Sequence, residues 1–150
     1  MTVAQVAVGS VESSLQLDVA GPLTTGDVAQ MAEYAGVEWA KHAFDETSSV
    51  TVVSRPLDVL LAEHGIAPGF ELLIVDVEGV EAEVLRGFDV AHWRPVMMVW
   101  ELTDTHPDLR LRRTDSIQVG AALVAHGYRI AYKDAINTVF VRADHMAAQA

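Results

Sequence analysis

Residues 72–79, Leu72-Leu-Ile-Val-Asp-Val-Glu-Gly79, give the strongest indication of how this chain folds. Four consecutive aliphatic residues lead to Asp76, and such an uninterrupted apolar run is typical of a strand that a parallel sheet buries on both faces. Val77-Glu78-Gly79 predicts a turn, and the spacing of the apolar residues over 80–87 predicts a helix. The expected unit is a strand, a tight turn and a helix, with a carboxylate where the strand ends.

The same design recurs at residues 96–101, Val-Met-Met-Val-Trp-Glu, where a second apolar strand ends at Glu101. Alternating and β-branched residues predict further strands, and capped apolar segments predict the helices between them. The expected strands cover residues 3–8, 14–19, 50–54, 128–132 and 138–142, and the expected helices cover residues 28–35, 56–65 and 115–126. This alternation predicts one α/β domain over residues 1–150.

The helix over residues 28–35 has clear signals at both ends. Asp27 is the expected N-cap, and Gly36 is the expected stop. Its apolar residues at helical spacing are Val28, Met31, Ala32 and Ala35. These residues share one face, which is the expected apolar face of the helix.

Composition limits the possible classes of function. Hydrophobic residues make up 51% of the 150 residues, which suffices for a core, and the formal net charge is −11. Such an acidic surface repels nucleic-acid phosphates and anionic membranes, so neither is an expected partner. The chain has no cysteine, which excludes disulfides, thiolate metal sites and cysteine nucleophiles. No segment has the pattern of a signal peptide or a membrane-spanning helix, so a soluble cytoplasmic protein is expected.

Acidic residues at strand ends are the main candidates for chemistry, because the GxGxxG, GxxxxGK[ST], GxSxG and HExxH motifs are all absent. Ligands of open α/β sheets bind outside the carboxyl ends of the strands, where Asp76 and Glu101 lie. A partly buried carboxylate there needs a ligand hydroxyl, a cation or a protein donor as its partner. The alternative is that Asp76 caps the turn and that Glu78 or Glu81 stabilises the next helix N-terminus.

His106 is a further candidate, because it follows the strand that ends at Glu101. A neutral imidazole near pH 7 could accept the proton of a substrate hydroxyl. The alternative is a surface histidine in a loop, in front of Pro107. The remaining histidines show no spacing typical of a metal site, and no metal ligands are predicted from them.

Several blocks of the chain occur in an order that is known from one protein family. The blocks are Leu73-Ile-Val-Asp-Val-Glu-Gly-Val-Glu81, Val84-Leu-Arg-Gly87, Trp93-Arg-Pro95 and Val99-Trp-Glu101, with Arg55-Pro-Leu-Asp-Val-Leu-Leu61 before them and residues 127–141 after them. They resemble the FkbM family of S-adenosylmethionine-dependent methyltransferases over most of the chain. The resemblance implies a partial Rossmann-like class I methyltransferase fold, with a mostly parallel sheet and a C-terminal antiparallel hairpin.

The resemblance also implies an activity and a set of site residues. The family methylates hydroxyl groups of small molecules or sugars, with S-adenosylmethionine as the donor. Asp76 would lie where donor and acceptor meet, as a base, a hydroxyl-orienting group or a ligand of a divalent metal ion. Glu101 would position the acceptor, and His106 is a lesser catalytic candidate. Asp76, Glu78 and Gly79 are the expected contacts to the donor.

The chain departs from the family pattern in its N-terminal part. The sequence has no counterpart of the donor-binding loop D-x-G-A-N-x-G or of the next strand, which ends in a ribose-binding acid. We therefore expect an FkbM-like domain that is N-terminally truncated relative to the family and has an incomplete donor site. Without the first strand, residues 72–76 form an apolar edge, which favours self-association, pairing with a separate chain that supplies the missing half, or poor solubility. Alternatively, residues 3–8 fold back and fill the vacant position.

Two other functions stay open on the sequence alone. One is a non-catalytic methyltransferase-like fragment or interaction module, which keeps the sheet but lacks a complete donor site. The other is a metal-dependent hydrolase that uses Asp76 and Glu101. Binding of the methyl donor and binding of divalent metal ions distinguish these functions from the first.

Overall fold

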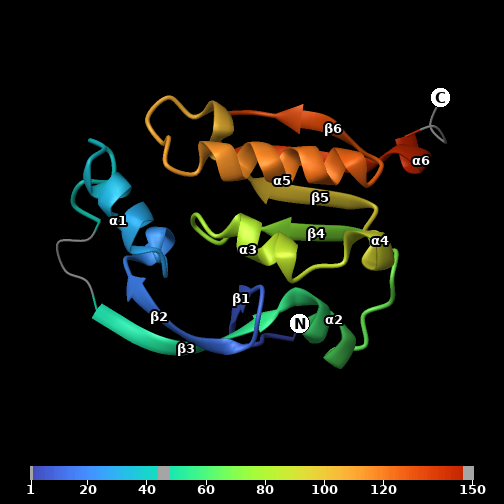
Figure 1. Cartoon of the computed structure of the whole chain (residues 1–150), viewed down its shortest axis with the longest axis horizontal. Coiled ribbons are helices and arrows are strands. Elements are labelled where there is room, and N and C mark those ends of the chain that lie inside the picture. Colours follow the sequence, from blue (N-terminus) through green and yellow to red (C-terminus); the bar gives the residue numbers. More distant parts are fainter. Residues whose placement is uncertain (1, 44–47, 147–150) are drawn as a thin grey trace.

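A computed structural model describes residues 2–43 and 48–146, which form two β-sheets and several helices (Figure 1). In the first sheet the strands lie in the order β1-β3-β2. These strands are β1 (Ala7–Gly9), β2 (Ser13–Val19) and β3 (Ser48–Pro56). β1 runs parallel to β3, whereas β2 runs antiparallel to it.

The second sheet carries the two apolar strands of the sequence. Its strands are β4 (Leu72–Val75), β5 (Met97–Glu101), β6 (Tyr128–Lys133) and β7 (Asn137–Arg142), in the order β4-β5-β7-β6. β4 and β5 are parallel, and the other two pairs are antiparallel. The C-terminal antiparallel hairpin is therefore confirmed. The expected mostly parallel sheet is wrong for the described residues, because strands joined by short turns, such as β6 and β7, must run in opposite directions.

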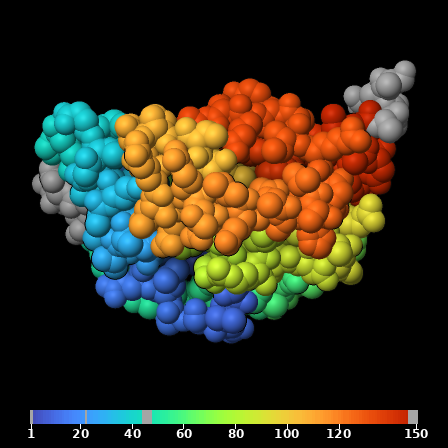
Figure 2. Space-filling model, turned by 45° about the horizontal axis from the view of Figure 1, so that its top comes forward, coloured from blue at the N-terminus to red at the C-terminus, as the bar shows by residue number. Residues whose placement is uncertain are grey.

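Helices cover one face of the second sheet. The helical elements are η1 (Gly21–Leu23), α1 (Val28–Ala35), α2 (Leu57–Glu63), α3 (Glu81–Arg86), α4 (Val90–Trp93), η2 (Thr103–Thr105), α5 (Arg113–Ala125) and α6 (Ala143–Met146). Residues of α3, α4 and α5 join those of β4, β5 and β7 in one core, against which α2 packs. Figure 2 shows this side, with α5 in orange and α3 in yellow-green. Within the described part of the chain, no helix combines the length and the apolarity needed to cross a membrane.

β4 is buried on only one of its two faces. Leu73 and Val75 point into the core and are 9% and 4% exposed. Leu72 and Ile74 point to the opposite face and are 44% and 62% exposed. The expectation that this strand is buried on both faces is therefore wrong, because the core helices that the structure describes all pack on the side of Leu73 and Val75.

One edge of β4 is also open. β4 pairs with β5 on one side, and no other strand of residues 2–43 and 48–146 pairs with it. Residues 3–8 do not fill this position, because the strand begins only at Ala7 and pairs with β3. That alternative is therefore wrong. Pairing of the edge with another chain stays a prediction, as does the assignment of residues 1–150 to one domain.

The ends of α1 agree with the sequence, but its buried face does not. The Asp27 side chain accepts a hydrogen bond from the Ala29 amide at 2.9 Å, and the helix ends before Gly36. The buried residues are Gln30 and Tyr34, whereas Val28 is 67% exposed. The residues that α1 buries are therefore not those of its apolar face. α1 packs on the polar turn after β4, where buried side chains need hydrogen-bonding groups.

Candidate functional site

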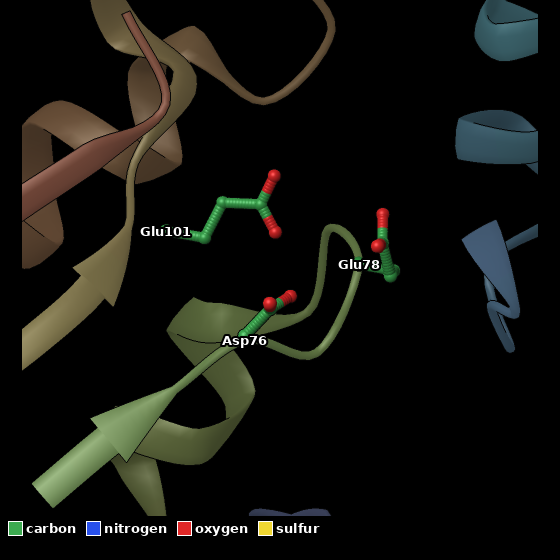
Figure 3. A group of neighbouring side chains, drawn as sticks. All are labelled: Asp76, Glu78 and Glu101. Atoms are coloured by element: carbon green, nitrogen blue, oxygen red, sulfur yellow. The ribbon is translucent and has the colours of Figure 1, made fainter. Parts of the chain in front are cut away.

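Three carboxylates meet at the carboxyl ends of β4 and β5 (Figure 3). Asp76 directly follows β4, Glu78 lies in the next turn, and Glu101 is the last residue of β5. One oxygen of each side chain lies within 4.8 Å of the corresponding oxygens of the other two. Because β4 and β5 are parallel neighbours, their ends bring Asp76 and Glu101 together at one edge of the sheet.

The turn after β4 has an unusual backbone that projects Glu78 into the acidic site. Glu78 and Gly79 both have positive φ angles, 53° and 100°. The Glu81 side chain accepts hydrogen bonds from the backbone amides of Val77 and Gly79, at 3.4 and 3.2 Å. These two hydrogen bonds to Glu81 stabilise the turn. This contact agrees with the alternative interpretation of Glu81 as a residue that stabilises the start of the next helix.

Glu78 is held in place from α1 and from the segment before it. The Tyr34 hydroxyl donates a hydrogen bond to Glu78 Oε2 at 2.5 Å. The Thr25 hydroxyl donates to the Glu78 backbone carbonyl at 2.9 Å. The sequence interpretation missed both residues, which lie far upstream of the acidic turn. The single signal for Tyr34 is a large aromatic residue off the expected apolar face of residues 28–35.

The crowding of acids changes their protonation. Burial raises the pKa of Glu101 from 4.5 to about 9, and a hydrogen bond with Asp76 and the charges of Glu78, Asp76 and Glu81 act in the same direction. Burial also raises the pKa of Glu78, which the Tyr34 hydrogen bond partly offsets. Glu101 therefore holds a proton at neutral pH. Its Oε2 atom is buried without a hydrogen-bond partner among the described residues.

Asp76 is the exposed acid among these three residues. Its side chain is exposed and lines a cavity of about 100 Å³ between β4 and β1. A carboxylate beside a protonated carboxyl group can accept a hydrogen bond, and then a proton, from a bound hydroxyl group. The three acids also offer oxygen ligands of the kind that Mg²⁺ or Ca²⁺ takes.

His106 is not part of the three-acid group. It is 8% exposed, so the surface position considered as an alternative is wrong. Its Nδ1 atom accepts hydrogen bonds from the amides of Asp108 and Leu109, both at 3.1 Å. This pattern leaves the imidazole proton on Nε2, and the two hydrogen bonds stabilise the loop that follows His106. Its predicted catalytic role stays a prediction that these contacts do not favour.

Two blocks of the family-like pattern meet away from the acids. Asp58 Oδ1 accepts hydrogen bonds from the Trp93 indole at 2.7 Å and from the Asp89 amide at 2.9 Å. The blocks around Asp58 and Trp93 thus join α2 to α4. Their role in this structure is to hold the helical layer together, whereas the blocks that end at Asp76 and Glu101 supply the site.

Comparison with known families agrees with these blocks. The family model described as the methyltransferase FkbM domain matches residues 1–130. No curated protein and no solved structure matches the chain. The match covers most of the 150 residues, and it includes both strands that bear the carboxylates and the turn between β4 and α3. The chain therefore belongs to the FkbM family of methyltransferase domains.

Proposed function

We propose that this chain acts in S-adenosylmethionine-dependent O-methylation of a hydroxyl group on a small molecule or a sugar. Membership of the FkbM family supports methyl transfer in general. The observation that supports a hydroxyl group as the methyl acceptor is the exposed Asp76 carboxylate. It lies next to Glu101, and Glu101 is protonated at neutral pH. Carboxylates of this kind bind and deprotonate hydroxyl groups.

Each acid has a distinct part in the proposed reaction. Bound S-adenosylmethionine would supply the methyl group, and its sulfur–methyl bond would break, releasing the neutral thioether, as the bond to the acceptor oxygen forms. Asp76 accepts the hydrogen bond of the acceptor hydroxyl, orients its oxygen and takes its proton. Glu101 donates a hydrogen bond to Asp76 and thereby fixes the direction of that carboxylate. Glu78 is held by Tyr34 and lines the same space from the turn.

The acidic site fits the reacting end of the donor. The carboxylates of Asp76 and Glu78 favour a positively charged sulfonium, and all three acids offer oxygen atoms that accept hydrogen bonds from hydroxyl groups. The cavity beside Asp76 has a volume of about 100 Å³, whereas pockets for drug-sized ligands measure about 300 Å³ or more. The described residues would therefore hold the reacting end, and the site for the rest of the donor stays incomplete in this proposal.

We also assign the second sheet to the C-terminal part of a Rossmann-like class I methyltransferase sheet. Family membership, the parallel β4–β5 pair and the closing β6–β7 hairpin support this assignment. The open edge of β4 supports it as well, because the first strand of such sheets pairs at that position. The same open edge favours the second candidate function, a non-catalytic methyltransferase-like module that lacks a complete donor site.

Donor binding and turnover test the proposal. We expect S-adenosylmethionine to give binding heat and a thermal shift with the purified chain. In a methyl-transfer assay over a panel of alcohols and sugars, Asp76→Asn should lower kcat by about 10²–10⁴-fold, since asparagine cannot take the proton. Asp108→Asn, in an exposed loop, is the matched control and should keep full activity.

The other outcomes separate the remaining functions. Absence of both donor binding and methyl transfer would favour the non-catalytic module. Titration of the chain with Mg²⁺ and Mn²⁺ tests the alternative function as a metal-dependent hydrolase. Metal binding that Asp76→Asn abolishes, without any donor binding, would favour metal-dependent chemistry at the acids. Donor binding that persists in Asp76→Asn, together with lost turnover, would support the proposed division of roles.

A further inference from the structure

The face of the second sheet that points away from the core helices carries two apolar rows. The strand register aligns Leu72 with Met97 and Val141, and Ile74 with Val99 and Val139. We call these six residues the open face. Leu72 and Ile74 are 44% and 62% exposed, and the other four are partly buried. Six aliphatic side chains thus lie in adjacent positions across three strands.

An apolar sheet face of this kind is usually covered by another layer of structure. The consecutive apolar residues of β4 and β5 are typical of strands buried on both sides, yet the described core helices pack on the opposite face. Contiguous apolar surface on a soluble protein marks an interaction site. The open face is therefore suited to burial, and the core helices of residues 2–43 and 48–146 do not cover it.

The open face continues into the acidic site. Side chains of a strand alternate between its two faces, so Asp76 follows Leu72 and Ile74, and Glu101 follows Met97 and Val99. A layer over the aliphatic rows would also flank the Asp76 carboxylate and the protonated Glu101. The negative charge of Asp76 beside the open face gives the occupant a definite chemistry, which is an apolar surface next to positive charge.

We propose that the open face binds an amphipathic helix from outside these 150 residues, with an apolar stripe and flanking basic residues. A helix is the usual cover of a sheet in α/β folds. Residues outside the described part occur in runs of at most four, which span about 6 Å as a helix. The three strands of the open face extend over about 10 Å between the outer two. A second copy is disfavoured as the occupant, since each chain carries a net charge of −11.

The test uses two labelled peptides of equal composition, each with about 14 leucine and lysine residues, or roughly four helical turns. In one peptide the leucines recur at helical spacing, and in the other they alternate with lysine as in a strand. Fluorescence anisotropy measures the binding of each peptide to the full chain. Ile74→Lys places a charge on the open face. Ile130→Lys is the matched control, because Ile130 is a 48% exposed isoleucine on β6, at the opposite edge of the same sheet.

We expect the helical peptide to bind the unmodified chain, at least about tenfold more weakly to Ile74→Lys, and within about twofold to Ile130→Lys. Slower hydrogen exchange in β4, β5 and β7 on addition of the peptide would support the same site without any substitution. Tighter binding of the alternating peptide would overturn the proposal in favour of strand pairing at the β4 edge. Equal weakening by both substitutions, no binding, or a dimer that Ile74→Lys dissociates would also overturn it. The proposal does not rest on methyl transfer.

Discussion

Glu101 links the chemistry of single residues to the stability of the chain. Its pKa rises from 4.5 to about 9 in the folded state, chiefly through burial. Between these two values the folded state holds a proton that the unfolded state releases. The free energy of unfolding therefore falls as pH rises through this range, and the contribution of Glu101 is greatest near its lower end.

This linkage predicts the behaviour of Glu101→Gln. Glutamine keeps the hydrogen-bond donor but does not titrate, so the variant should gain stability relative to the unmodified chain between about pH 5 and pH 8. The gain should be on the order of 1–2 kcal/mol after allowance for solvent screening. Urea unfolding at both pH values measures it. Glu71→Gln is the control, since Glu71 is an exposed acid just before β4. An equal pH effect in both variants would contradict the assignment of the titration to Glu101.

Among the secondary-structure elements, the turn between β4 and α3 constrains the site most strongly. Gly79 has a φ of 100°, and a Cβ atom there would lie 2.8 Å from the Gln30 side chain of α1. Gly79→Ala should therefore destabilise the chain by about 2–4 kcal/mol, through backbone strain and the clash with α1. Thermal or urea unfolding measures the loss.

A second glycine, Gly65, allows the cost of backbone strain to be measured separately from the cost of the clash with Gln30. Gly65 also has a positive φ, 65°, but a Cβ atom there would meet nothing within 4 Å. Gly65→Ala should cost only about 1 kcal/mol, the backbone penalty of a left-handed residue. Gln30→Ala added to Gly79→Ala should recover part of the larger loss. If both glycine variants lose the same stability, contact between α1 and the turn does not constrain the site.

The sequence predicts the elements better than their surroundings. Local signals such as the Asp27 cap and the apolar run before Asp76 identify α1 and β4, because caps and periodicity depend on neighbouring residues. Burial depends on which layers are present, so the exposure of Ile74 could not be predicted from the run itself. The Tyr34–Glu78 contact joins residues 44 positions apart. No periodicity encodes such a long-range polar contact.

Over the whole molecule, charge and packing oppose each other. The chain has 21 acidic and 10 basic residues, so most charge pairs repel, and three of the acids lie together at the site. Surface ion pairs such as Arg94–Asp144 and Arg55–Glu63 offset little of this repulsion, because exposed pairs contribute about 0–1 kcal/mol each. The folded state is therefore destabilised by its own net charge at low ionic strength.

Screening should relieve this repulsion. Raising NaCl from about 10 mM to 1 M shortens the Debye length from about 30 Å to about 3 Å. We expect the chain to gain about 1 kcal/mol, or a Tm increase of about 2–4 °C for a chain of this length. Measuring Tm at two protein concentrations separates screening from association at the open face, because only association makes Tm depend on concentration. A Tm that falls with salt at both concentrations would mean that attractive ion pairs outweigh the excess of acids.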